Sequence, residues 1–132
     1  MIRVWNGDAV EQELEGVLPK TAKSHNVFDK ANVPAGGVRT KVFEWTLAPN
    51  EEFYLQTVTG WGDTSAVWEI EIDGAFVGGG RTSTADITLL LDYGRGFRKV
   101  LGGKKIEVFV EQYTDKVFEM KVNLGGGLVT GN

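Results

Sequence analysis

The sequence contains no cysteine, a single histidine (His25) and only three prolines in 132 residues. Without thiols the chain can form neither disulfides nor thiolate metal sites, and it cannot use a cysteine nucleophile. No apolar run approaches the ~20 residues that a membrane-spanning helix needs. A chain of this length can instead bury one hydrophobic core large enough to fold without metals or disulfides. The sequence therefore predicts a single globular domain.

An excess of positive charge is also missing. The formal net charge is −4, and the lysines and arginines are scattered along the chain. Nucleic-acid-binding domains usually concentrate basic residues on one face. The stretch Met1–Asp8 lacks the apolar segment of a signal peptide. We therefore expect no nucleic-acid partner and no membrane partner, and we expect synthesis in the cytoplasm of the producing cell.

What the sequence does contain, from Val38 onward, is an alternation of apolar and polar residues with a period of two. The clearest case is the stretch Val67–Ile72, in which Trp68, Ile70 and Ile72 alternate with more polar neighbours. This period is typical of a strand with one buried and one solvated face. Asp73-Gly74 follows directly, and both residues tolerate the positive φ of a type I′ turn. A tight hairpin is therefore predicted here.

Similar segments recur every eight to fifteen residues, which is typical of a sandwich or barrel. Strands are expected at Phe43–Leu47, Phe53–Thr59, Asp86–Leu91, Lys105–Gln112 and Lys116–Leu124. The alternation places Trp45 and Trp68 in the core and Val42 and Phe109 on the outside. The predicted fold is all-β, an antiparallel β-sandwich of jelly-roll type over residues 39–132.

The first 38 residues lack this pattern, and Pro19 and Pro34 interrupt any regular element. Asp8–Leu18 could form one short helix, with Asp8 as its cap. The rest is predicted to be an extended, irregular N-terminal arm over residues 1–38. The arm would gain order by burying Val27 and Phe28 on a partner; the alternative is a disordered segment.

Catalytic patterns are sparse. His25 lies in the expected arm, where it would not be held rigidly against a nucleophile and a carboxylate. Glu69 and Glu71 occupy the polar face of one strand, as they would in any solvated sheet. Gly78-Gly79-Gly80 lacks the helix and the lysine of a phosphate-binding loop and is better explained by a bulge or bend. We expect no enzymatic activity, no cofactor and no dedicated metal site, although a calcium site assembled from separate loops stays open.

Aromatic residues offer the better functional signal. Trp5 lies in the expected arm, and Trp61 and Tyr93 lie in expected loops, each next to glycine. Exposed aromatic rings either anchor protein interfaces or stack on sugar rings. Together with Val27 and Phe28, these three residues form the predicted partner-binding set.

Several segments resemble small jelly-roll proteins of tailed bacteriophages, in particular capsid decoration and head proteins. The resemblance is carried by Thr46–Phe53, Trp68–Gly74, Arg81-Thr82-Ser83 and Leu101–Val110. The sequence departs from the family pattern at Gly102-Gly103-Lys104, where Gly-Asp would be expected before the valine-rich strand.

This resemblance implies a non-enzymatic virion structural protein, a decoration or cement protein on the capsid surface. It further implies a homo-oligomer, typically a trimer, whose N-terminal arm binds the major capsid protein and neighbouring copies. Two other hypotheses remain open: a carbohydrate-binding or receptor-binding module of the same fold, and a small β-barrel enzyme that acts through loop carboxylates.

Overall fold

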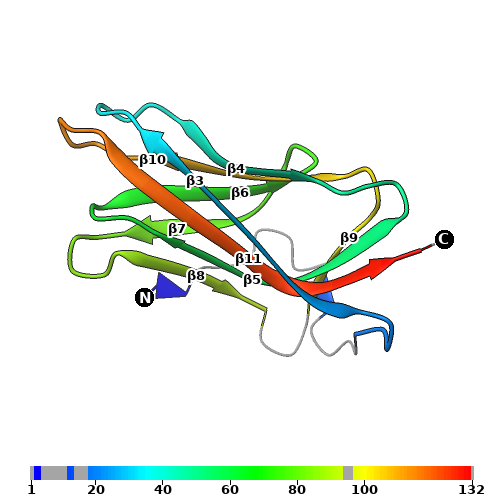
Figure 1. The fold of residues 1–132 in the computed structure, drawn as a ribbon. Coiled ribbons are helices and arrows are strands. Elements are labelled where there is room, and N and C mark those ends of the chain that lie inside the picture. The colour runs from blue at the N-terminus through cyan, green and yellow to red at the C-terminus, as the bar shows by residue number, and fades with distance from the viewer. Residues whose placement is uncertain (1, 4–11, 14–17, 94–96, 132) are drawn as a thin grey trace.

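Two mainly antiparallel β-sheets packed face to face make up the described part of the protein, as a computed structural model shows (Figure 1). The structure describes residues 2–3, 12–13, 18–93 and 97–131. No helix occurs within these ranges. The predicted all-β sandwich is confirmed.

The larger sheet has seven strands and the smaller has four. The strands of the larger sheet are β1 (Ile2–Arg3), β2 (Gln12–Glu13), β3 (Lys23–Val33), β5 (Glu51–Trp61), β8 (Thr88–Asp92), β9 (Phe97–Val100) and β11 (Phe118–Thr130). The smaller sheet contains β4 (Thr40–Thr46), β6 (Ala66–Ile72), β7 (Ala75–Thr82) and β10 (Lys105–Glu111). The main path of the larger sheet runs β1-β8-β5-β11-β3, and β9 pairs with β5 and β2; the smaller sheet runs β4-β10-β6-β7.

The core fills the space between the sheets. Most of its large, fully buried members alternate along their strands with less buried residues, as a two-layer sandwich requires. They include Phe43, Leu47, Phe53, Leu55, Trp68, Ile70, Leu89, Leu91, Ile106, Met120 and Leu124. Trp68 is thus a core residue as predicted, whereas Trp45 is half-buried and packs against the edge of the core.

The hairpin between β6 and β7 confirms the Asp73-Gly74 prediction. Ile72 pairs with Ala75, which leaves a two-residue turn. Both turn residues have positive φ, 52° at Asp73 and 84° at Gly74. This is the backbone that a type I′ turn requires.

In the smaller sheet, bulges change which residues face the core at two places. The β4–β10 register shifts between Val108 and Phe109, and Val42 is buried at 2 % exposure. The expectation that Val42 faces outward is therefore wrong, because an extra residue in one strand reverses the alternation locally. The second bulge lies in the β6–β7 pairing, between Ile70 and Glu71. It borders the run of three glycines, where a bulge or bend was expected.

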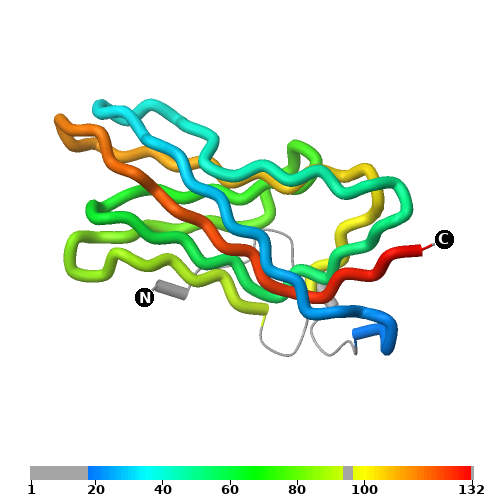
Figure 2. The backbone as a smooth tube through the Cα atoms, in the orientation of Figure 1, coloured from blue at the N-terminus to red at the C-terminus, as the bar shows by residue number. Residues whose placement is uncertain are grey.

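Part of the expected arm is a strand of the sandwich. β3 pairs with β11 over eleven residues, from Lys23 opposite Leu128 to Val33 opposite Phe118. Figure 2 shows the two strands side by side along their length. The apolar pattern of β3 was missed because Asp29 and His25 interrupt the inward series Val27, Ala31 and Val33.

About half of the remainder of the expected arm lies outside the described residues. This holds for Trp5 and for most of the short helix expected over Asp8–Leu18. Gln12–Glu13, within that segment, is described as strand β2, paired with β9.

Candidate binding surface

An aromatic pair lies on the outer face of the larger sheet. Leu124 and Val27 pair across β11 and β3 and point into the sandwich, so their neighbours Asn123 and Phe28 point outward. On the other side of β11, Trp61 of β5 pairs with Lys121, again on the outer face. The strand alternation therefore brings Phe28 and Trp61 to the same surface.

The two rings contact each other across β11. Their centroids are 6.1 Å apart and the ring planes are inclined by 37°. Phe28 is 52 % exposed, and Trp61 is half-buried. Asn123 and Thr59 are paired beside them in the same row of the sheet. We call Phe28 and Trp61 the aromatic patch.

An ion-pair cluster flanks the aromatic patch. Glu119 of β11 pairs with Lys30 of β3 at 3.5 Å and with Lys121 of β11 at 3.2 Å. Both lysine side chains help to hold the pKa of the Glu119 carboxyl below its usual range, the Lys121 hydrogen bond most strongly. The surface is thus an apolar centre with a charged border, the usual arrangement of a protein-binding face.

The other predicted contact residues do not join the patch. Val27 packs against the core from the inner face of β3. Tyr93 is only 4 % exposed, so its ring offers no surface for stacking in this structure. Trp5 lies outside the described residues. Sequence reasoning named Phe28 and Trp61 separately but missed their contact, because it placed Phe28 in an arm and Trp61 in a loop.

Tyr93 is a core residue with a buried hydroxyl. Within the described part of the chain this hydroxyl has no hydrogen-bond partner. Burial raises the pKa of Tyr93 to about 12, although the nearby Arg98 side chain opposes the rise. Ionising the phenol inside the sandwich is unfavourable because the phenolate would lose its hydration.

The outer face of the smaller sheet carries a network of ion pairs instead. Arg39 bonds to Glu69 at 3.2 Å and to Glu71 at 2.6 Å. Its guanidinium also lies 3.6 Å from the centroid of the Phe109 ring. The outward-facing Phe109 is therefore covered by a side chain of its own chain. Glu69 and Glu71, which sequence reasoning assigned to a solvated face, share one arginine partner.

A second ion-pair group lies beside the first. Lys41 bonds to Glu44 at 2.7 Å and to Glu107 at 2.9 Å, and Lys105 lies 3.6 Å from both carboxylates. The hydrogen bond from Lys41, more than any other contact, lowers the pKa of the Glu44 carboxyl. The same bond is the largest cause of the raised pKa of Lys41. With these charges matched, the face carries no concentrated charge of one sign.

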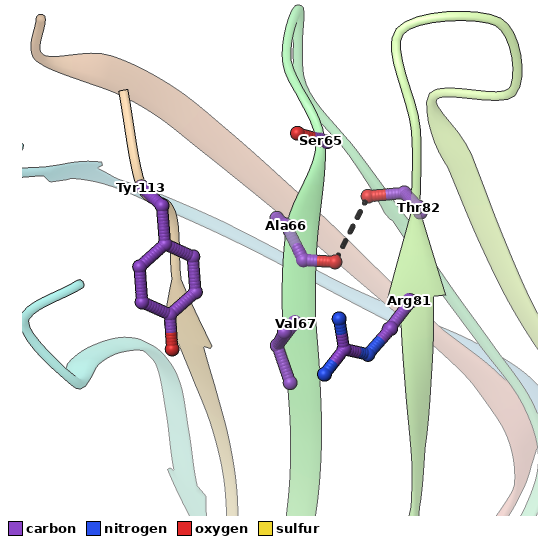
Figure 3. A pocket seen from close by; sticks show the side chains of 6 residues that line it. All are labelled: Ser65, Ala66, Val67, Arg81, Thr82 and Tyr113. Atoms are coloured by element: carbon purple, nitrogen blue, oxygen red, sulfur yellow. Dashed lines mark hydrogen bonds between the residues drawn. The ribbon is translucent and has the colours of Figure 1, made fainter. Parts of the chain in front are cut away.

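A small pocket opens beside this face (Figure 3). Its volume is about 70 Å³, and it is lined by Ser65, Ala66, Val67, Arg81, Thr82 and Tyr113. The buried Trp68 Nε1 donates to Thr82 Oγ1 at 3.0 Å, which in turn donates to the carbonyl of Ala66 at 3.5 Å. A pocket of this size is too small for a sugar ring or a peptide side chain of any length, since ligand pockets usually exceed ~300 Å³.

The imidazole of His25 lies against two aromatic rings. Its ring packs on Trp45, with centroids 5.4 Å apart, and on the edge of Phe53 at 6.2 Å. Over the described ranges, no three histidine, aspartate or glutamate side chains gather closely enough to hold a metal ion. The same residues include no helix that is long and apolar enough to cross a membrane.

No protein-family model matches the chain, and no curated protein is detectably similar to it in sequence.

Proposed function

We propose that this protein is a non-enzymatic structural protein of a virion, which docks onto the capsid of a tailed bacteriophage through the aromatic patch. The observation that supports a binding role is the contact between Phe28 and Trp61 on an open sheet face. Aromatic residues at the centre of a surface, bordered by charges, are typical of the residues that dominate binding energy. The resemblance of the sequence to phage decoration proteins supports the capsid as partner.

Capsid protein and further copies of this chain are the proposed partners. Phe28 lies on β3, the last strand of the main sheet path. A partner that covers the patch would therefore also reach the edge of the sandwich. Such a position suits a protein that lies across the boundary between two subunits.

Carbohydrate binding is the second candidate, and the geometry of the patch favours it specifically. The Phe28 and Trp61 rings are inclined by 37° and together offer a shallow apolar platform. The amide of Asn123 and the hydroxyl of Thr59 come from the same outer face. Stacking rings with adjacent hydrogen-bonding groups are what a sugar ring requires, since it has both apolar faces and hydroxyl edges.

The test of the patch is a pair of matched substitutions in the full chain. Phe28→Ser removes the ring of the patch that is 52 % exposed. Phe76→Ser removes a ring of similar exposure, 47 %, from the smaller sheet. Binding to capsids that lack the protein is measured by co-sedimentation, and self-association by sedimentation velocity. We expect Phe28→Ser to weaken binding at least tenfold and Phe76→Ser to leave it unchanged.

The same two variants separate the two candidates. If Phe28→Ser abolishes binding to a glycan array but capsids never bind the wild-type chain, the sugar-binding candidate replaces the capsid proposal. Equal binding by wild type and Phe28→Ser in both assays would contradict any role for the aromatic patch.

Truncation at the predicted boundary of the arm is a poor test of its role. A shortened chain that starts at Val38 would lack β3 and would leave one edge of β11 unpaired over eleven residues. Loss of binding by such a protein would reflect an incomplete sheet. Deletion of residues 1–17 keeps β3 and is the appropriate truncation for testing the N-terminal segment.

A further inference from the structure

A cavity lies at the end of the sandwich where β3 begins and β11 ends. Its volume is about 300 Å³, at the lower limit of the ~300–1,000 Å³ found for small-molecule sites. It is lined by Thr21, Lys23, Ser24, His25, Leu128 and Thr130. This cavity is separate from the aromatic patch, so a ligand bound there is independent of the proposed function.

The strand register explains why these residues meet. Lys23 pairs with Leu128, and His25 pairs with Gly126, whose side-chain position is filled by the Tyr54 carbonyl and the Phe53 ring. Thr130 follows Leu128 on the same face of β11. The lining comes from β3, from β11 and from Thr21 just before β3, so the cavity lies at this end of the larger sheet.

An aromatic cluster supports one side of the cavity. The His25 ring packs on Trp45, and Trp45 packs edge-on against Phe53 with centroids 4.9 Å apart. A half-buried imidazole held between two rings has few orientations open to it. The cavity therefore has one wall whose position is fixed by the core.

Each polar side chain of the lining can donate a hydrogen bond. Lys23 supplies an ammonium, His25 an imidazole, and Thr21, Ser24 and Thr130 supply hydroxyls. None of the six lining residues is acidic. In a chain with more acidic than basic residues, 18 against 14, an acid-free lining of this kind favours a negatively charged ligand.

From this lining we infer that the cavity binds a small molecule that carries an oxyanion, such as a phosphate, a sulfate or a carboxylate. Lys23 is the main source of positive charge, and the hydroxyls donate to the remaining oxygens. Charge-assisted hydrogen bonds of this kind are about twice as strong as those between neutral groups. Leu128 and the His25 ring contact the non-polar part of the ligand.

The test uses the fact that the chain has only one histidine. The imidazole C–H signals of His25 therefore appear once in a carbon-edited NMR spectrum and report on the cavity directly. The full chain is titrated with inorganic phosphate, sulfate or acetate at constant pH, and with chloride at matched ionic strength. We expect a saturable shift with at least one of the three oxyanions and none with chloride.

Two lysine variants show whether binding depends on the cavity. Lys23→Gln removes the charge at the cavity, and Lys30→Gln removes a lysine on the outer face of the same strand. We expect the first to weaken oxyanion binding about tenfold and the second to leave it within a factor of two. Thr130→Val, a nearly isosteric change on the other strand, should also weaken oxyanion binding. It replaces Lys23→Gln as the test variant if Lys23→Gln disturbs the amide spectrum.

Three results would overturn the inference: shifts that fail to saturate, chloride acting as well as the oxyanions, or equal loss in Lys23→Gln and Lys30→Gln. A preference among the three oxyanions would identify the head group. Phosphate alone would indicate a phosphate ester, and acetate alone would indicate an organic acid.

Discussion

The indole of Trp68 lies directly on the backbone of Gly60, so that a Cβ atom at position 60 would be 2.6 Å from Cζ3 of the ring. Trp68 belongs to the smaller sheet and Gly60 to the larger, and this contact joins the two layers near the middle of the core. Trp68 is 1 % exposed, and its Nε1 atom donates to Thr82. The ring therefore cannot move aside without breaking that hydrogen bond.

Gly60→Ala should for this reason destabilise the protein. In an unobstructed strand the exchange would be favourable, because glycine loses more backbone entropy on folding than alanine. Here the added methyl overpacks the core, which typically costs about 1–3 kcal/mol. Urea unfolding followed by tryptophan fluorescence measures the change. Gly131→Ala is the control, because its nearest atom would be an ordinary 3.4 Å away, and it should be nearly neutral.

Gln112 is the second position where one side chain holds several segments together. It is fully buried, and its Nε2 group donates to the carbonyls of Val33, Pro34 and Lys116. Its Oε1 atom accepts from the N–H and the hydroxyl of Thr114. The amide thus ties the β3–β4 connection to the β10–β11 turn.

Gln112→Leu should reduce the free energy of unfolding by about 3 kcal/mol, since it leaves buried backbone groups without partners. Thr114→Val, which removes only the hydroxyl, should cost about 1 kcal/mol. Chemical denaturation of both variants checks the order. Equal stabilities would show that water replaces the amide at little cost.

The sequence was a good guide to the β6–β7 hairpin and a poor guide to the larger sheet, and the hairpin expected between Lys105–Gln112 and Lys116–Leu124 is wrong because β10 and β11 belong to different sheets. The β6–β7 hairpin was predictable because Asp73-Gly74 has a strong local turn preference and the flanking alternation is regular. β11 was predicted only as far as Leu124, yet it continues to Thr130 through three glycines. Those glycines are paired on both sides by β3 and β5, a long-range arrangement that local preference cannot reveal.

The candidate sites show the same limit. Phe28 was predicted to be a contact residue because it is an apolar anchor of the expected arm, whereas the structure places it on strand β3 with 52 % exposure. Its contact with Trp61 depends on β3 and β5 both pairing with β11, which joins residues far apart in the chain. The cavity at His25 depends in the same way on the pairing of Lys23 with Leu128. Neither arrangement has a signal in the sequence near those residues.

Arg39 offers a test of whether the ion-pair face contributes to stability. Arg39→Met keeps an apolar side chain near Phe109 but removes both ion pairs and the cation–π contact. Because Arg39 is partly exposed, we expect a loss of only about 1 kcal/mol. Arg39→Lys should lose nearly as much, since an ammonium cannot bond two carboxylates in the forked geometry of a guanidinium. Thermal unfolding at low and high salt checks this, with the smaller difference at high salt.

The raised pKa of Tyr93 predicts that the protein loses stability at high pH. Below pH 10 the phenol is protonated in both folded and unfolded protein and has no effect. Between pH 10 and about 12 the unfolded chain releases the proton while the folded protein keeps it, so stability falls as the pH rises. A shift of this size corresponds to at most about 3 kcal/mol.

Tyr93→Phe should remove that part of the alkaline loss. Urea unfolding at pH 9 and pH 11 gives the loss of unfolding free energy between these pH values for wild type and for the variant. We expect the loss to be smaller in the variant. An identical alkaline loss in both proteins would mean that Tyr93 ionises equally easily in the folded state.

Asp29 is expected to protect the edge of the larger sheet. β3 is the last strand of that sheet's main path within the described residues, and Asp29 Oδ1 accepts a hydrogen bond from the N–H of Lys30 at 2.8 Å. Because the N–H of Lys30 already donates to this carboxylate, it does not donate to a strand of another molecule. Charged residues on edge strands also disfavour pairing between molecules. Asp29→Val should therefore increase self-association, visible as concentration-dependent light scattering. Asp115→Val, outside the strands, is the control and should not.

The position of β11 between β3 and β5 also sets an order for folding. β6 and β7 are joined by two residues, and their pairing can form within a short stretch of chain. The centre of the larger sheet forms later, because β5 and β3 do not pair with each other. Both pair with β11, which begins at Phe118. Distant pairings are slow, since the entropy of closing a long loop must be lost first. During synthesis, β3 and β5 therefore leave the ribosome without their common partner, and the surface that carries Phe28 and Trp61 is completed last.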